Sequence, residues 1–134
     1  FLKINKPRYD DSWQRWNKTL SMLKDIDTRT VLRITLIRNY NDHLDMIPAF
    51  ASMIKQSSPH FIEIKSYMHI GRSTNRLEHS NMLEMDEVRN FSEELAKQSE
   101  IFSIMDESLV SRIVILQNNQ RSINRWISAY ANTN

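Results

Sequence analysis

The chain has 134 residues, of which 40% are hydrophobic and 25% charged, with a formal net charge of +2. This composition is typical of a soluble globular chain, and the length predicts a single segment, residues 1–134. Cysteine is absent and glycine occurs once, which excludes disulfides, thiolate-held clusters and a glycine-rich phosphate loop within these residues. The longest apolar runs fall well short of the roughly 20 residues that cross a bilayer, so we expect no membrane span.

The first half of the chain predicts two helices and two strands in alternation. After an extended lead, large apolar residues at helical spacing predict an amphipathic helix over 11–25. Trp13 and Trp16 are most simply core anchors, and the alternative is that an exposed Trp stacks on a base. The β-branched run 30–38 predicts a strand. A helix is expected over 47–57, where Pro48 falls in the first turn and costs no intrahelical hydrogen bond. Residues 61–68 predict the second strand.

The second half predicts a long polar loop over 69–84, a helix over 85–98, a strand over 111–116 and a short closing helix over 123–130. Alternating helices and strands with connections of this length are typical of parallel strands joined by crossover helices. The expected fold class is therefore α/β. Three strands cannot close a barrel, so we expect an incomplete sheet or about half of a barrel.

Two of the predicted strands carry polar residues on one face. Side chains alternate along a strand, so Leu32, Ile34 and Leu36 share one face and Ile62 and Ile64 the corresponding face of the next strand. The opposite face carries Arg33, Thr35, Glu63, Lys65 and Tyr67. A parallel sheet covered on both sides is normally hydrophobic on both. These residues therefore either satisfy one another in a polar core or face a ligand, and the sequence leaves both interpretations open.

The loops after these strands hold the next candidate residues, because functional groups of parallel sheets gather at the carboxyl ends of strands. They are Arg38, His69, Arg72, Ser73, Asn75, Arg76 and Asn81. Guanidinium and amide groups suit phosphate or base contacts, and the estimated pI of 9.0 is compatible with such a partner. The alternative is an ordinary solvated loop. The four histidines show no metal-ligand spacing, and no catalytic motif is present.

Several blocks of the sequence resemble one known family. The blocks 8–41, 59–82 and 86–96, and the late run 111–116, resemble the C-terminal portion of the tRNA 4-demethylwyosine synthases, which are radical S-adenosylmethionine enzymes. The most specific part is Phe61 to Leu77, "FIEIKSYMHIGRSTNRL". The chain departs from the family pattern at Ser66, where Gly or Ala is frequent, at Arg72, where Tyr is frequent, and at Asn39, where Gly is common. Asn tolerates left-handed backbone, so the last change is mild.

The resemblance implies the C-terminal part of a partial (β/α) TIM-type barrel of the radical S-adenosylmethionine type. Such enzymes form the tricyclic base from N1-methylguanosine next to the anticodon of phenylalanine tRNA, with pyruvate as co-substrate, in the cytoplasm. The cluster cysteines and the lysine that engages pyruvate belong to the N-terminal half, so this segment would ligate no metal, contain no catalytic residue and be inactive alone. Carried over by position, the implied cofactor-facing residues are Arg33, Thr35, Glu63, Lys65 and Tyr67. The implied tRNA-binding residues are Arg38, His69, Arg72, Ser73, Asn75, Arg76 and Asn81.

Two other functions remain open from the sequence. A stand-alone RNA-binding module without catalysis would also explain the basic loop and the pI. A different barrel enzyme with a metabolite substrate would explain the polar strand face. The absence of an initiator Met and of a signal region at Phe1 indicates a segment of a longer protein.

Overall fold

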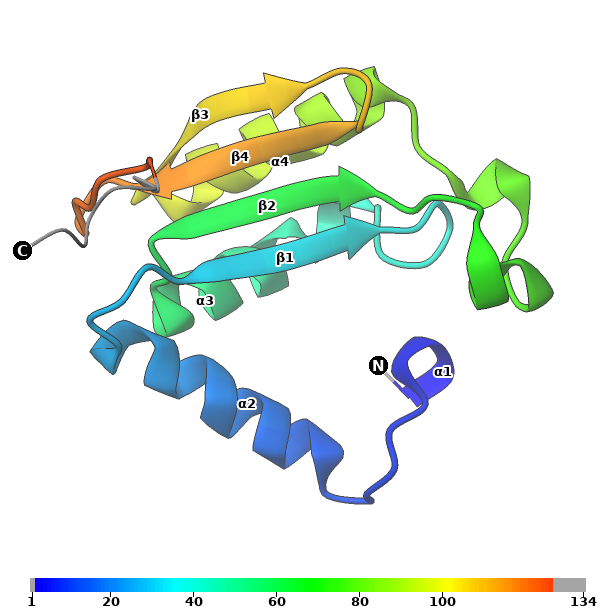
Figure 1. The fold of residues 1–134 in the computed structure, drawn as a ribbon, viewed down its shortest axis with the longest axis horizontal. Coiled ribbons are helices and arrows are strands. Elements are labelled where there is room, and N and C mark those ends of the chain that lie inside the picture. The colour runs from blue at the N-terminus through cyan, green and yellow to red at the C-terminus, as the bar shows by residue number, and fades with distance from the viewer. Residues whose placement is uncertain (1, 127–134) are drawn as a thin grey trace, which may run out of the picture.

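The computed structural model describes residues 2–126, which form a four-stranded mixed sheet with helices packed on one face (Figure 1). In chain order, the helices and strands are α1 (Leu2–Asn5), α2 (Ser12–Met22), β1 (Val31–Leu36), α3 (Ile47–Ser57), β2 (Phe61–Ser66), α4 (Met85–Ser99), β3 (Phe102–Ser108) and β4 (Ile113–Asn118). The predicted α/β class is therefore confirmed. In the described residues, no helix has the length and apolar character that crossing a membrane requires.

The order of strands in the sheet is β1-β2-β4-β3. β1 and β2 pair in parallel, as predicted, and their register places Arg33 opposite Glu63 and Thr35 opposite Lys65. β4 pairs antiparallel with both β2 and β3, so the prediction of an all-parallel sheet is wrong for this strand. The strand that follows α4 and runs parallel to β2 is β3, and the hairpin then inserts β4 between them (Figure 1).

β3 is absent from the prediction because its sequence lacks a clean alternation. A register shift between Ile104 and Asp106 interrupts the pairing with β4, and a bulge of this kind breaks the period of two that identifies a strand. Asp106 and Glu107 also favour a loop over a strand in the sequence, yet both form ion pairs in the structure. Arg89 of α4 donates to Glu107 at 3.0 and 3.1 Å, and Arg125 donates to Asp106 at 2.9 Å.

The main core lies between the sheet and the helices α3 and α4. Leu32, Ile34 and Leu36 of β1 and Ile62 and Ile64 of β2 are buried in it, as the strand faces predicted. The helices contribute the expected apolar stripes, including Ile47, Ala51 and Ile54 of α3 and Val88, Phe91 and Leu95 of α4. Phe50 and Phe91 meet edge to face with ring centroids 5.7 Å apart. One face of the sheet is thus buried under α3 and α4.

Helix ends follow local chemistry. α3 begins with Pro48 in its first turn and ends at Ser57, and the next residue, Ser58, adopts a left-handed conformation. α4 begins with a reciprocal capping box between Glu84 and Glu87, which satisfies N–H groups that have no intrahelical partner. α4 therefore starts at a fixed point just after the long loop.

The N-terminal region differs from the prediction in two respects. The lead is helical in α1 rather than extended, and the tryptophans of α2 are not core anchors. Trp13 and Trp16 are 51% and 37% exposed, and Leu20 is the residue of α2 that is buried. Helical spacing located α2 correctly but did not identify which side of it packs. Of the closing helix expected over 123–130, residues 123–126 are not helical and the remainder lies outside the described residues.

Candidate functional site: the open sheet face and the loop after β2

The sheet face opposite α3 and α4 carries no helical layer in residues 2–126 (Figure 1). Val31 is 53% exposed there, and Arg33 and Gln117 are exposed as well. β1 and β2 place Arg33 beside Glu63 and Thr35 beside Lys65 on this face. The structure therefore brings four of the five predicted cofactor-facing residues together on one open surface.

The charges on this surface are divided between a pair and a single cation. Arg33 donates to Glu63 at 3.0 Å across the strand pair, and the Glu63 side chain is only 14% exposed. Lys65, two residues further along β2, has no carboxylate within 4.0 Å among residues 2–126. Glu63 is thus satisfied by Arg33, whereas the Lys65 ammonium is available to an anionic group.

Tyr67, the fifth predicted residue, lies beyond the end of β2. It is 6% exposed and belongs to a separate small cluster with Ile37 and Leu77. Its hydroxyl lies 3.1 Å from His69 Nδ1 and donates to Ser73 Oγ at 3.1 Å. Tyr67 therefore holds the loop after β2 in place through its contacts with His69 and Ser73.

The loop after β2 is compact, because many of its polar groups form hydrogen bonds with one another. It contains two short 3-10 helices, Gly71–Asn75 and His79–Asn81. Gly71 has φ +62°, a conformation that side chains disfavour. Asn81 is buried, accepts the Glu78 backbone N–H at 2.8 Å and donates to the Arg38 carbonyl at 3.0 Å. The long polar stretch is thus a folded element.

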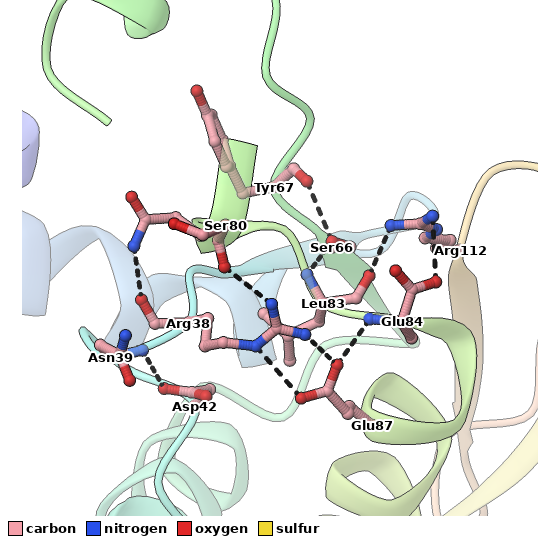
Figure 2. A network of polar contacts seen from close by, with 11 residues as sticks. Arg38, Asn39, Asp42, Ser66, Tyr67, Ser80, Leu83, Glu84, Glu87 and Arg112 are labelled. Carbon is pink, nitrogen blue, oxygen red and sulfur yellow. Dashed lines mark hydrogen bonds and ion pairs between the residues drawn. The ribbon is translucent and has the colours of Figure 1, made fainter. Parts of the chain in front are cut away.

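Two arginines fasten the loop to the helix layer. Arg38 donates to the Ser80 carbonyl at 2.7 Å and to Glu87 Oε1 at 3.2 Å, and its second nitrogen pairs with Glu87 Oε2. Arg112 donates to the Leu83 carbonyl at 2.9 Å and pairs with Glu84 at 3.0 Å. Figure 2 shows Arg38 held between Ser80 and Glu87. We name the set Arg38, Glu84, Glu87 and Arg112 the loop brace.

Hydrogen bonds within the loop brace keep Glu87 ionised. Burial raises the pKa of Glu87, but hydrogen bonds from Arg38 and from the Glu84 backbone outweigh it, so the pKa lies below its ordinary value. The hydrogen bond with Glu87 likewise raises the pKa of Arg38. Both groups are therefore charged at neutral pH. Arg38, a predicted tRNA-binding residue, has its guanidinium engaged inside the protein.

Two of the residues that depart from the family pattern have a structural explanation. Ser66 is fully buried, accepts the Leu83 N–H at 2.8 Å and donates to the Tyr67 carbonyl at 2.9 Å. A small apolar residue would lose this tie between β2 and the end of the loop. Asn39 has φ 69°, which is the left-handed geometry expected for it.

Other predicted loop residues point outward. Arg72, Asn75 and Arg76 are exposed. Neither Arg72 nor Arg76 has a carboxylate within 4.0 Å among residues 2–126. The cations that the brace does not use are therefore the ones that the loop presents on its surface.

Beside Arg76 the loop surface has an open hollow of about 380 Å³, lined by residues 74–79 and His69. His69 and His79 meet there edge to face, with ring centroids 6.0 Å apart and an interplanar angle of 70°. His79 and the brace acids were not singled out by the sequence reasoning. The capping signature of Glu84 and Glu87 could have located the brace, whereas nothing local in the sequence marks His79.

The opposite end of the sheet has a structural role. His60 is 6% exposed, and its Nδ1 accepts the Thr30 backbone N–H at 3.2 Å. Burial, together with Arg121 and Arg29, lowers the pKa of His60. Arg121 in turn donates to the carbonyls of Leu23, Ser58 and Ile26. Among the described residues, no group of three His, Asp or Glu side chains could hold a metal ion.

Comparison with known proteins identifies relatives of this chain. Residues 56–118 match the family model described as wyosine base formation. The S-adenosyl-L-methionine-dependent tRNA 4-demethylwyosine synthase of Pyrococcus abyssi is 36% identical over 116 residues, which cover 87% of this chain and 33% of the relative. The synthase of Methanocaldococcus jannaschii is 41% identical over 112 residues, covering 84% of this chain and 34% of the relative. The chain thus spans about a third of these archaeal relatives.

Solved structures agree with the sequence relatives. A structure of TYW1 with a lysine-pyruvate adduct bound superposes with a TM-score of 0.76 at 38% identity, covering 87% of this chain and 36% of that one. A crystal structure of archaeal TYW1 superposes with a TM-score of 0.68 at 33% identity over the same shares. Sequence and fold therefore agree that residues 56–118 match the wyosine base formation family and that the chain, over most of its length, is similar to part of the tRNA 4-demethylwyosine synthases.

Proposed function

We propose that this chain is the part of a tRNA 4-demethylwyosine synthase that supplies one wall of the reaction cavity and contacts to tRNA. The observation that carries the proposal is the continuity of the open sheet face with the loop after β2. The face presents Lys65 without an anionic partner among residues 2–126, and the loop presents Arg72 and Arg76 in the same way. A cavity that acts on one base of a large RNA needs both a polar wall and a basic rim.

The proposed substrate is N1-methylguanosine next to the anticodon of phenylalanine tRNA, with pyruvate as co-substrate. The Arg33–Glu63 pair and Lys65, with Thr35 beside them, form the cavity wall and face the cofactor or the base, and Tyr67 holds the rim. Arg72, Asn75 and Arg76 contact tRNA directly. His69, Ser73 and Asn81 belong to the same tRNA-binding loop, Arg38 after β1 completes this tRNA-binding set, and the hydrogen bonds of these four residues hold the shape of the loop.

The residues of the open face fit S-adenosylmethionine in chemical type. That cofactor carries an ammonium and a carboxylate group; the face offers the Lys65 ammonium to the carboxylate, and Glu63, although paired with Arg33, keeps further acceptor sites for an ammonium. When bound with a reduced iron-sulfur cluster, S-adenosylmethionine supplies the radical that starts the reaction in this family. The chain contains no cysteine, so the cluster ligands would come from residues outside it.

The architecture of the whole enzyme follows from the same proposal. The β1 edge of the sheet continues into the remaining strands of a partial (β/α) barrel of the radical S-adenosylmethionine type, contributed by the N-terminal half, and residues 1–134 act as one segment of it. The isolated segment would be inactive, and the enzyme would work in the cytoplasm. The third strand of a regular barrel would here be β3, with β4 inserted beside β2.

The tRNA contacts are tested by removing the two loop cations in the full-length protein. Replacing both Arg72 and Arg76 with Ala should weaken binding of phenylalanine tRNA about tenfold at physiological salt. The slope of log K against log salt should fall by about 1.4 to 1.8, because each lost phosphate contact removes about 0.7 to 0.9. Fluorescence anisotropy of labelled tRNA at several salt concentrations measures both quantities.

A matched control removes two positive charges elsewhere. Lys55 and Lys97 lie near the C-terminal ends of α3 and α4, away from the loop, and their replacement with Ala gives the same net charge. This variant should bind tRNA with nearly the wild-type slope. Equal slopes for the two double variants would show that binding depends only on overall charge and would contradict the proposed role of the loop.

A further inference from the structure

The hollow beside Arg76 is a second feature of the tRNA-facing loop, separate from the open sheet face. Its volume of about 380 Å³ lies at the lower end of the range of small-molecule sites. It is lined by one guanidinium, Arg76, one carboxylate, Glu78, two imidazoles and the side-chain amide of Asn75. A lining that is nearly neutral but rich in hydrogen-bonding groups suits a ligand with both a phosphate and a polar ring.

The placement of charges in the hollow favours an anion at Arg76. The Glu78 carboxylate accepts the Asn81 backbone N–H in the capping box of the second 3-10 helix, which holds this carboxylate at the start of that helix. Arg76 has no carboxylate within 4.0 Å among residues 2–126. The Arg76 guanidinium would therefore pair with one phosphate group of a ligand without giving up an ion pair within the protein.

A chain of hydrogen bonds fixes the inner imidazole. Ser73 Oγ donates to the Ile70 carbonyl at 2.7 Å, so it can only accept from the Tyr67 hydroxyl at 3.1 Å. Because the single proton of Tyr67 is used in this way, His69 Nδ1 must donate to the Tyr67 oxygen at 3.1 Å. Neutral His69 then keeps Nε2 as an acceptor. The outer imidazole, His79, is exposed beside it.

The geometry points to the hollow as a binding site for one unpaired nucleotide of the tRNA, with the phosphate on Arg76 and the base stacked on the His79 ring. Asn75 and His69 belong to the same lining, and the Asn75 amide and His69 Nε2 would form hydrogen bonds with the edge of the base. Single-stranded RNA is commonly read by bases splayed onto aromatic side chains, histidine among them. This site is distinct from the cavity that holds the reacting base, and it rests on the proposed function.

The site is tested in the full-length protein with a fluorescein-labelled hairpin that has the sequence of the anticodon stem-loop. Replacing His79 with Ala should weaken binding about tenfold, which is the size of effect that a lost base-stacking contact has. His79→Phe keeps an aromatic face and should bind within about twofold of wild type. His43→Ala removes another exposed histidine that does not line the hollow and should leave binding unchanged.

The outcomes separate this inference from the proposed function. If wild type binds the hairpin, the Arg72 and Arg76 double variant weakens binding, and His79→Ala binds like wild type, the hollow inference alone is wrong. Weak binding by both His79→Ala and His79→Phe would also overturn the stacking role. If wild type shows no salt-dependent binding, the proposed tRNA contacts and the hollow fail together. Thermal unfolding at an unchanged temperature shows that each variant is folded, as expected for an exposed position.

Discussion

Replacing Phe91 with Ala is expected to lower the free energy of unfolding by about 3 to 5 kcal/mol, the range for removing a buried phenylalanine side chain. Phe91 is 1% exposed and belongs to the main core between the sheet and the helices. Its ring meets Phe50 of α3 edge to face, so the change also removes an aromatic pair. Urea denaturation followed by tryptophan fluorescence measures the loss.

A truncation on the surface provides the control. Val110 lies in the turn between β3 and β4 and is 94% exposed, so Val110→Ala should change the free energy of unfolding by less than about 0.5 kcal/mol. If Phe91→Ala also cost less than about 1 kcal/mol, α4 would not be packed on the sheet as described. The loop brace, which depends on the start of α4, would then lose its support.

Replacing Lys65 with Met is expected to lower kcat/KM of the full-length enzyme about tenfold to a hundredfold. Lys65 lies on the open face without an anionic partner among residues 2–126, so its ammonium has no structural ion pair to lose. A hydrogen bond to a charged ligand contributes about 1.5 to 3 kcal/mol, which corresponds to this range of rates. Methionine keeps most of the aliphatic length and isolates the effect of the charge.

Lys55→Met is the matched control for this change. Lys55 is a lysine of α3 that pairs with Glu100 at 3.5 Å, and its side chain is 42% exposed, so its replacement should leave kcat/KM within about twofold of wild type. An unchanged kcat/KM for Lys65→Met would place the cavity elsewhere. A large loss of stability in Lys65→Met would instead assign Lys65 a structural role.

The parts of the fold that could be predicted from the sequence are those in which local pattern and burial agree. The alternation in β1 and β2 assigned Leu32, Ile34, Ile62 and Ile64 to the core, and they are buried there. The same pattern could not identify β3, because the bulge before Asp106 breaks the alternation. Nor could it give the direction of β4, which depends on a hairpin whose first strand was not recognised.

The candidate site shows the same division. Alternation alone placed Arg33, Glu63 and Lys65 on one surface, because neighbouring parallel strands keep their faces aligned. Which charges pair could not be predicted, since the partner of Glu63 is set by the register of β1 against β2. The partner of Arg38, Glu87, lies 49 residues away on α4. Arg38 is therefore held inside the protein while Arg72 and Arg76 are exposed, and this difference depends on tertiary contacts that the local sequence does not show.

The proposed activity is tested by incubating the full-length protein anaerobically with a reductant, S-adenosylmethionine, pyruvate and phenylalanine tRNA that carries N1-methylguanosine. Mass spectrometry of the digested tRNA then identifies the modified nucleoside. We expect N1-methylguanosine to be converted to the tricyclic 4-demethylwyosine base, and the Lys65→Met enzyme to convert it far more slowly. Unchanged N1-methylguanosine, in a reaction whose protein is folded and carries its reduced cluster, would contradict the proposed function.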